Sequence, residues 1–270
     1  MFVFNNNYIF KIVCENNHLE LAKYIYRIKP EIKTIINNTL FNYLCVYDCL
    51  DILKWLLIIS YKINTTNSKF FPFIIACENG RIKTAKWLYN INPNFNLSMK
   101  NDLIFKKVCK NGHLEVAKWL YKKNPNINIS HNEESAFCNA CFGGHLEIAK
   151  WLYQIKPNID INIKDNLCFV WACTNSNLEL AKWLYSINNN VYIQDDNDYI
   201  LIKSCLNNDI EMVRWIFSII IPDLSKNNHR IFKTVCRQGL VEIAIYLQSI
   251  KPDLYWIEVI DNKIYNFGLK

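Results

Sequence analysis

Apolar residues return along the chain with a period of about 32 residues. Eight cysteines stand 31 or 32 residues apart, a Phe or Leu precedes each of them by four residues, and a Trp or Tyr follows each by ten. We call these the Cys, Phe and Trp columns. The Cys column is Cys14, Cys45, Cys77, Cys109, Cys141, Cys173, Cys205 and Cys236. Three columns that keep one register indicate eight copies of one structural unit.

Residues 135–166 illustrate the pattern inside one unit. Phe137, Ala140 and Cys141 are spaced i, i+3 and i+4, which predicts a short first helix with one apolar face. A Gly-Gly pair then interrupts the helix. Residues 146–155 carry apolar side chains around well over half of a helical circumference, which predicts a second helix with only a thin polar stripe.

A second helix that is apolar on so many sides must be flanked by others like it. One unit cannot bury that surface alone, so the units are expected to stack as an all-α-dominated solenoid of about eight helix-turn-helix units joined by short, hairpin-like loops. We expect the Trp column to lie buried on the broad apolar arc. A proline sixteen residues after the cysteine marks a turn at the end of five units. These prolines are Pro30, Pro93, Pro125, Pro157 and Pro252.

The unit resembles the ankyrin repeat. Ala140 and Cys141 stand where that family has an Ala-Ala pair, residues 144–147 read Gly-His-Leu-Glu as in the family, and residues 149–152 match its Val-Val-Lys-Leu-Leu region. The resemblance covers nearly the whole chain. The family's Thr-Pro-Leu-His turn is replaced here, for example by Phe-Pro-Phe-Ile at residues 71–74, and the period is about one residue shorter than the usual 33. Units rich in Trp, Cys and Asn look most like the ankyrin-repeat proteins of giant DNA viruses.

The resemblance implies a single ankyrin-repeat domain over residues 1–270. The expected repeats span residues 8–38, 39–70, 71–102, 103–134, 135–166, 167–198, 199–229 and 230–261, followed by a tail at 262–270. The segment after Lys251 is expected to cap the last repeat.

Composition limits the other classes of protein. Apolar residues make up 51% of the 270 residues, yet no apolar run approaches the ~20 residues of a membrane span. The N-terminus lacks a basic region and a small-residue cleavage site, so no signal peptide is predicted. Eleven cysteines in such a chain are expected to be reduced and buried rather than paired. We expect a monomer in the cytoplasm, which is the host cytoplasm if the protein is viral.

Two groups of residues suggest metal or redox chemistry. His18, His113 and His145 share one column, but stacked helices lie ~10 Å apart, which is too far for a shared ion with ligand bonds of ~2 Å. We therefore expect a structural role near the start of the second helix. Cys138 and Cys141 form one C-x-x-C without the second pair that a zinc ribbon needs. No catalytic signature is present, so we expect no enzyme, no metal and no cofactor.

The formal net charge of +7 suggests an alternative, a basic nucleic-acid-associated scaffold. A Lys or Arg stands nine residues after each of seven cysteines, and we call this the basic stripe. Six of these seven cations follow an acidic residue by three positions, and such pairs largely cancel. Lys107, Lys110, Lys203 and Lys233 on the first helices favour nucleic acid. We expect any such binding to be weak and nonspecific.

The positions two before and one after each cysteine change from unit to unit. They share one face of the first helix, and we call them the variable face; in resembling ankyrin proteins it lines the concave groove that binds partners. The candidate partner-binding residues are Tyr43, Lys107, Lys110, Asn139, Phe142, Trp171, Thr174 and Lys203. Trp171 stands beside Lys203 and near Phe142 in this prediction, either as a binding hot spot or as a filler between layers.

The predicted function is recognition of a partner protein, of the host if the protein is viral, without chemical change. A second alternative is a ubiquitin-ligase adaptor of the kind found among viral ankyrin proteins, although the residues after Leu254 are too few for an F-box-like domain.

Overall fold

The computed structural model describes residues 6–63, 71–127, 129, 135–161, 163–188, 199–220, 222–254, 256–260 and 263–267. The chain divides into two compact units. The first comprises Met1–Gly143 with Glu147–Ile155, and the second comprises Gly144–Leu146 with Lys156–Lys270.

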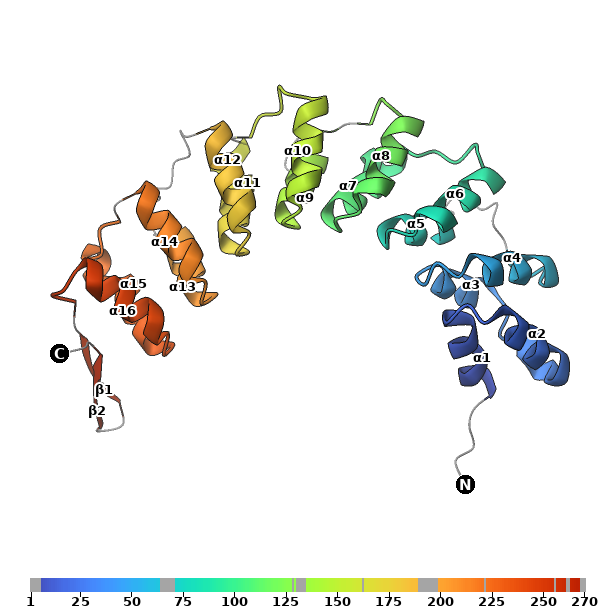
Figure 1. Cartoon of the computed structure of the whole chain (residues 1–270), viewed down its shortest axis with the longest axis horizontal. Coiled ribbons are helices and arrows are strands. Elements are labelled where there is room, and N and C mark those ends of the chain that lie inside the picture. Colours follow the sequence, from blue (N-terminus) through green and yellow to red (C-terminus); the bar gives the residue numbers. More distant parts are fainter. Residues whose placement is uncertain are drawn as a thin grey trace. The chain divides into compact units, whose positions relative to one another are not determined.

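Consecutive helices of the first unit form hairpins, one for each expected repeat (Figure 1). Its helices are α1 (Asn6–Glu15), α2 (Leu19–Ile28), the 3-10 helix η1 (Pro30–Thr34), α3 (Asn38–Leu44), α4 (Leu50–Ile59), α5 (Phe71–Glu78), α6 (Ile82–Ile91), α7 (Met99–Lys110), α8 (Leu114–Lys123), α9 (Ala136–Phe142) and α10 (Leu146–Ile155), whose first residue belongs to the second unit.

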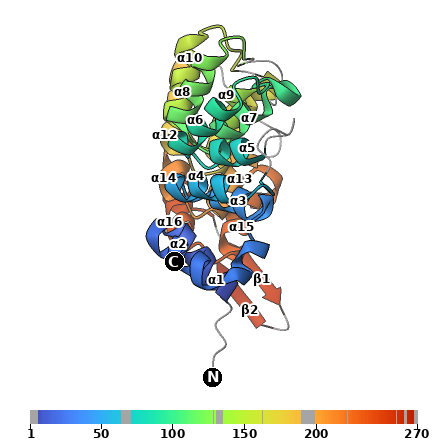
Figure 2. The same ribbon diagram turned by 90° about the vertical axis from the view of Figure 1, so that its right-hand side faces the viewer.

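The second unit continues the pattern and ends in a β-hairpin. Its elements are α11 (Ile163–Thr174), α12 (Leu178–Ile187), α13 (Tyr199–Leu206), α14 (Ile210–Ile219), α15 (Lys226–Arg237), α16 (Val241–Ile250), β1 (Trp256–Ile260) and β2 (Lys263–Phe267). Within each unit the first helices of the hairpins lie along one side and the second helices along the other (Figure 2). The all-α-dominated repeat fold is confirmed.

A left-handed residue ends the first helix of every repeat. The third position after each column cysteine has a positive φ in all eight repeats, as Gly80, Gly112, Gly144 and Gly239 or as Asn17, Asp48, Ser176 and Asn208. The backbone N–H of His113, next after Gly112, donates to the carbonyl of Val108 at 3.1 Å. This bond turns the chain back toward the second helix while satisfying a free carbonyl of α7.

The Phe and Cys columns form the core between the two helices of each repeat. Among the largest fully buried side chains are Phe10, Phe41, Phe73, Phe105, Phe137 and Phe232. All eleven cysteines are free and buried, so the predicted state of the thiols is confirmed.

The Trp column lies less deep than predicted. Every tryptophan of the column is only partly buried. Four of them pack edge-on against a tyrosine of the preceding repeat, as Trp151 does against Tyr121 at 5.9 Å and 88°, whereas Trp87 is tilted by 48° against Phe41. Because these indoles contact both helices of the preceding repeat and still remain partly exposed, the prediction of a buried Trp column is wrong.

The described linkers after the first repeat form turns, and the C-terminal tail forms a β-hairpin. The described linkers, at 60–63, 92–98, 124–127, 156–161 and 222–225, contain turns and no strand. The two strands that the structure describes are β1 and β2, which pair antiparallel from Trp256 opposite Phe267 to Ile260 opposite Lys263. Before the hairpin, Leu254 is buried and its carbonyl accepts a hydrogen bond from Gln248 at 3.1 Å. The side chains of the strands lie outside the described residues, so the capping role of this tail stays a prediction.

Candidate protein-binding face

The side chains of the variable face are all at least partly exposed to solvent. Its residue pairs are Ile12/Glu15, Tyr43/Val46, Ile75/Glu78, Lys107/Lys110 and Asn139/Phe142 in the first unit, and Trp171/Thr174, Lys203/Leu206 and Thr234/Arg237 in the second. None of these sixteen side chains is buried, whereas every member of the intervening Cys column is. One side of each first helix therefore faces the core and the opposite side is free to vary.

An aromatic cluster occupies the start of the face. The Tyr43 hydroxyl donates to the Glu15 carboxylate at 2.7 Å and lies 3.0 Å from the Tyr47 hydroxyl. The two tyrosine rings are 5.3 Å apart, and the Lys11 ammonium lies 5.9 Å from the Tyr43 ring. The hydrogen bonds to Tyr47 and Glu15 raise the pKa of Tyr43 well above its usual value. Tyr43 and Tyr47 are each 41% exposed, so the cluster presents ordered rings to solvent.

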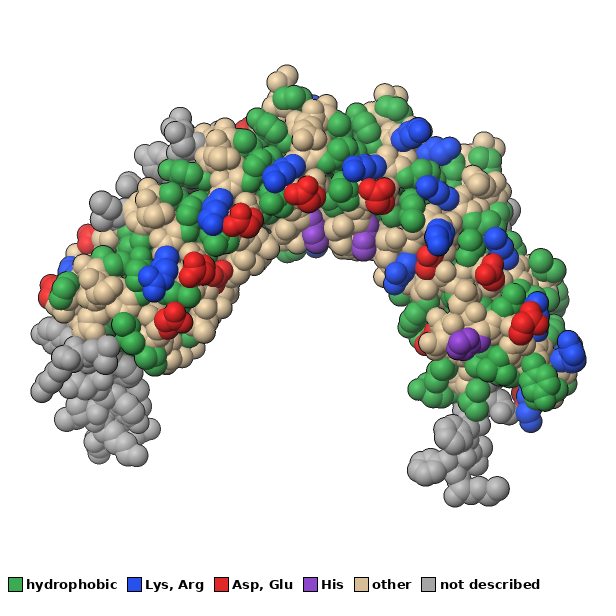
Figure 3. Space-filling view, in the orientation of Figure 1, with side chains coloured by type: hydrophobic (Ala, Val, Ile, Leu, Met, Phe, Trp, Pro, Cys, Tyr) green, Lys and Arg blue, Asp and Glu red, His purple; other side chains and the backbone are tan. Residues whose placement is uncertain are grey.

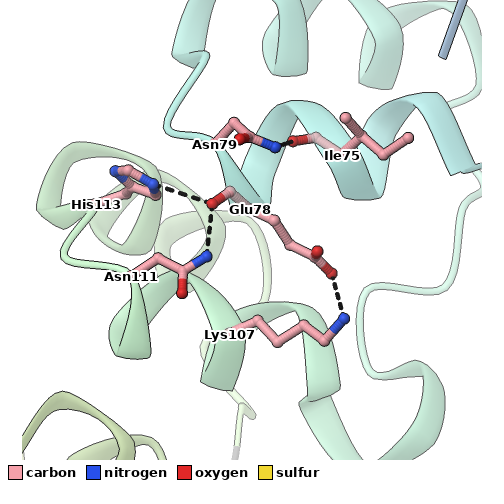
Figure 4. Close-up of polar contacts among 6 residues, drawn as sticks. All are labelled: Ile75, Glu78, Asn79, Lys107, Asn111 and His113. Atoms are coloured by element: carbon pink, nitrogen blue, oxygen red, sulfur yellow. Dashed lines mark hydrogen bonds and ion pairs between the residues drawn. The ribbon is translucent and has the colours of Figure 1, made fainter. Parts of the chain in front are cut away.

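An ion pair links the third and fourth repeats of the face. The Lys107 ammonium lies 2.8 Å from the Glu78 carboxylate (Figure 4). The Glu78 backbone carbonyl accepts hydrogen bonds from Asn111 at 2.8 Å and from the His113 ring at 3.0 Å. This carbonyl is at the end of α5, where helical partners run out. The ion pair and the hydrogen bonds between these two repeats therefore hold the side chains of this part of the variable face in place.

Lys110 and Phe142 lie together in the fourth and fifth repeats. The Lys110 ammonium is 4.5 Å from the Phe142 ring centroid, within the range of a cation–π interaction. Phe142 is 40% exposed. Asn139 instead turns inward along its own helix and donates to the Ser135 carbonyl at 3.0 Å, which makes it less available to a partner.

The second unit holds the other three predicted residues. Trp171 is half-buried. Thr174 donates to the Val170 carbonyl at 2.8 Å, and its own carbonyl accepts from Asn207 at 2.6 Å. Lys203 is exposed, with its ammonium 6.0 Å from the Tyr199 ring. Trp171 and Phe142 belong to different units, so their proximity stays a prediction.

One neighbour of the variable face, Tyr47, is not among the residues predicted from the sequence. Tyr47 stands two residues after its cysteine, where five other repeats carry Asn. Two of these asparagines, Asn111 and Asn207, donate to a carbonyl of the preceding repeat, whereas Asn16 and Asn79 donate to a carbonyl of their own helix. The replacement of a recurring Asn by Tyr was a visible signal that this position had been freed for another use.

The other candidate chemistry has structural explanations. His113 bonds to the Glu78 carbonyl, as the structural prediction requires, and Arg81 at the equivalent position donates to the Val46 carbonyl. No group of three or more metal-ligating side chains occurs among the residues that the structure describes. Burial raises the pKa of the Cys14 thiol to about 12 and that of Cys236 to about 11, which makes both poor nucleophiles.

The basic stripe on the second helices is largely paired with acids. The ion pairs that recur there are Lys23–Glu20, Lys118–Glu115, Lys150–Glu147 and Lys182–Glu179, at 2.7 to 3.6 Å. Figure 3 shows blue Lys or Arg side chains next to red Asp or Glu side chains at several places along this surface. The pairing predicted from spacing is confirmed at these four sites, and it reduces the attraction of the stripe for a phosphate backbone.

No helix within the described part of the chain is both long and apolar enough to traverse a bilayer.

Comparison with known proteins agrees with the helical hairpins. A family model described as ankyrin repeats in three copies matches residues 9–101 and 73–165. No curated protein matches the sequence. Among solved structures, the human ASB11 ankyrin repeat domain is similar with a TM-score of 0.52 at 17% identity, over 77% of this chain and 96% of that one; at this identity the likeness concerns the fold alone. Ankyrin repeats generally serve as non-catalytic scaffolds for protein–protein interaction. The chain belongs to the ankyrin-repeat family.

Proposed function

We propose that the chain is a non-catalytic scaffold that binds a partner protein through its variable face. The observation that carries the proposal is the contrast on the first helices: the buried Cys column repeats one residue type in all eight repeats, while the residue pair on the variable face takes seven different forms. Stacking alone needs the buried columns. The exposed positions are therefore open to selection for a partner, as in the concave groove of ankyrin-repeat proteins.

The chemistry of the face suits a protein surface. The first unit offers the tyrosine pair Tyr43 and Tyr47, then the ring of Phe142 under Lys110. Aromatic side chains provide large contact areas with little rotamer entropy to lose, which is why they predominate at binding hot spots. The hydrogen bonds and ion pair between repeats hold these groups in place before binding, and this preorganisation favours affinity.

The contacts of the first-helix lysines argue against the alternative of nucleic-acid binding. Lys107 is paired with Glu78, and Lys110 is engaged with Phe142. Two of the four first-helix cations that motivate this alternative are therefore engaged within the protein, which reduces their contribution to binding a phosphate backbone. A viral origin, a host partner, a cytoplasmic location, the adaptor role and a monomeric state all stay predictions.

Site-specific crosslinking tests the proposal. A photoreactive amino acid is placed at Tyr47 on the variable face or, as the matched control, at Lys86 on the second helix α6, and both proteins are expressed in the native cell. The same partner band is expected from position 47, absent from position 86, and lost when Tyr43→Ala is added. Equal crosslinking from both positions would show that partners do not select the variable face.

A further inference from the structure

A cavity of about 440 Å³ lies on the opposite side of the first repeats from the variable face, between the ends of α2 and η1 and the ring of Trp55 on α4. The residues that line it are Lys23, Tyr26, Arg27, Pro30, Lys33 and Trp55. Three of the six are cationic, two are aromatic, and none is acidic. The volume is within the range of sites that hold small ligands.

The aromatic part of this cavity is explained by stacking. Tyr26 packs edge-on against Trp55 at 5.5 Å and 87°. The equivalent pair two layers further on, Tyr89 and Trp119, has nearly the same geometry at 5.6 Å and 89°. Because the ring pair recurs, it belongs to the repeat architecture and carries no information about a ligand.

The cations are not explained by stacking. Arg27 stands thirteen and Lys33 nineteen residues after the column cysteine of the first repeat. The third repeat has Asn90 and Asn96 at these positions, and no other repeat has a cation at both. The same framework therefore forms without them, and the pair is a specific feature of the first repeat.

The lining has positive charge in excess. The Lys23 ammonium is satisfied by Glu20 at 2.7 Å, and the Lys33 ammonium lies 5.5 Å from the Tyr26 ring centroid. Among the described residues no carboxylate pairs with Arg27 or Lys33, and both side chains are exposed. The lining therefore carries two positive charges beside two aromatic rings, and an anionic ligand would neutralise these charges.

We propose that this cavity binds a phosphate monoester, presented by a phosphorylated side chain of a partner protein. A monoester carries about −1.5 to −2 charges at neutral pH, which matches Arg27 and Lys33 together. A guanidinium can donate two parallel hydrogen bonds to phosphate oxygens, and Lys33 adds a point charge. The site does not depend on the variable face, so either proposal can fail without the other.

The shape of the site favours a projecting group as the ligand. The donors line a concave space with aromatic walls, so the anion must enter it with an apolar stem that contacts Trp55 and Tyr26. A phosphorylated side chain has both parts. Inorganic phosphate would leave the ring surfaces uncovered.

Calorimetric titration of the full chain with phenyl phosphate tests the site. The double variant Arg27→Asn/Lys33→Asn copies the third repeat and is expected to fold normally, with binding weakened by about tenfold or more. The control Lys83→Asn/Lys86→Asn removes the same charge from α6 and should change affinity less than about twofold. Phenyl sulfate, a monoanion, should bind more weakly, and lowering the pH from about 7.5 to about 5.5 should weaken phenyl phosphate alone, because its second proton binds near pH 6.

Several results would overturn the proposal. These are the absence of binding by phenyl phosphate, equal losses in the two double variants, or equal affinity for phenyl sulfate. A final arm compares a phosphotyrosine peptide with phosphatidylcholine vesicles that contain phosphatidylinositol 4-phosphate. Capture by the vesicles alone, lost in the Arg27→Asn/Lys33→Asn variant, would refute a protein source of the phosphate.

Discussion

The Phe column and the Trp column are equally regular in sequence but differ in burial. Phe105 is 1% exposed, whereas Trp151, one layer further on and 6.3 Å from it, is only partly buried. The phenylalanine lies between the two helices of its own repeat and touches the next. The tryptophan contacts the preceding repeat and keeps an edge in solvent. In a stacked repeat protein, regular recurrence of a residue therefore reports contact between neighbours, not depth of burial.

The largest effect is expected for the thiols behind the Phe column. In the folded protein Cys109 should react with a thiol reagent about a thousandfold more slowly than in the unfolded chain, because it must await local opening. Cys236 is 8% exposed and serves as the internal comparison that should react sooner. Peptide mapping by mass spectrometry measures both rates. Rapid modification of most column cysteines in the native protein would contradict the register.

Because the thiols of the Cys column are buried, the free energy of unfolding is expected to vary with pH in the alkaline range. The pKa of Cys14 rises from its ordinary 9.0 to about 12 on folding, and that of Cys236 to about 11. Above about pH 9 the unfolded chain releases these protons and the folded one does not. The stability that the buried, protonated thiols contribute is therefore complete below pH 9 and is lost as the pH rises toward their pKa values in the folded protein. Urea denaturation of wild type and Cys14→Ala across this range measures the difference.

Among the substitutions, replacing a phenylalanine of the Phe column by alanine should lower the free energy of unfolding the most. Phe105→Ala should lower the free energy of unfolding by about 3 to 5 kcal/mol, since it removes a fully buried ring and leaves a cavity. Urea denaturation followed by circular dichroism provides the value. A loss no larger than that of Trp151→Ala would remove the distinction between the columns.

Trp151→Ala should cost less, about 1 to 3 kcal/mol, because part of the indole is already solvated and the edge contact with Tyr121 supplies much of the remainder. A double-mutant cycle with Tyr121→Ala isolates that contact. Zero coupling between the two sites would show that the ring pair does not stabilise the stack.

A turn glycine tests contact between repeats at a smaller scale. Gly80 has φ of +72°, and a Cβ there would lie 2.5 Å from the His113 ring of the next repeat. Gly239 has φ of +68° with nothing within 4 Å. Gly239→Ala should lower the free energy of unfolding by about 1 kcal/mol, because Ala is strained in a left-handed backbone. Gly80→Ala should lower it by more, because its Cβ also meets the His113 ring. Thermal melting of both variants decides this, and identical shifts would mean that His113 moves aside freely.

The smallest stability effect is expected at Trp171. On the variable face, Trp171→Ala should lower the free energy of unfolding by about 1 kcal/mol or less, while partner capture weakens by about 2 kcal/mol if the ring is a hot spot. Melting and capture are measured on the same preparation. A melting shift as large as that of Trp151→Ala would place Trp171 in the core and exclude it from the face.

Some of the variable face could be predicted from the sequence and some could not. The exposure of Tyr43 and Phe142 followed from helical spacing beside a buried cysteine. The contact of Tyr43 with Glu15 joins residues 28 apart, and it depends on how two repeats stack. The inward turn of Asn139 was likewise hidden, because an amide can bond to solvent or to its own helix with equal ease.

The C-terminal hairpin lies beyond the repeat pattern. Two apolar-rich segments flank Asp261 and Asn262, a pattern typical of a two-residue turn between strands. The 32-residue period ends just before this segment, so the period predicts a cap there but gives no information about strands.

The repeat, its helices and the buried Phe and Cys columns are predictable from the sequence, because a fixed helical spacing of apolar side chains places them on one face in every copy. The depth of the tryptophans, the contacts of exposed side chains across repeats, and the cavity that Arg27 and Lys33 line with Tyr26 and Trp55 emerge only from the folded arrangement. Those features depend on the rotation and separation of neighbouring repeats, and the periodic pattern is compatible with a range of both.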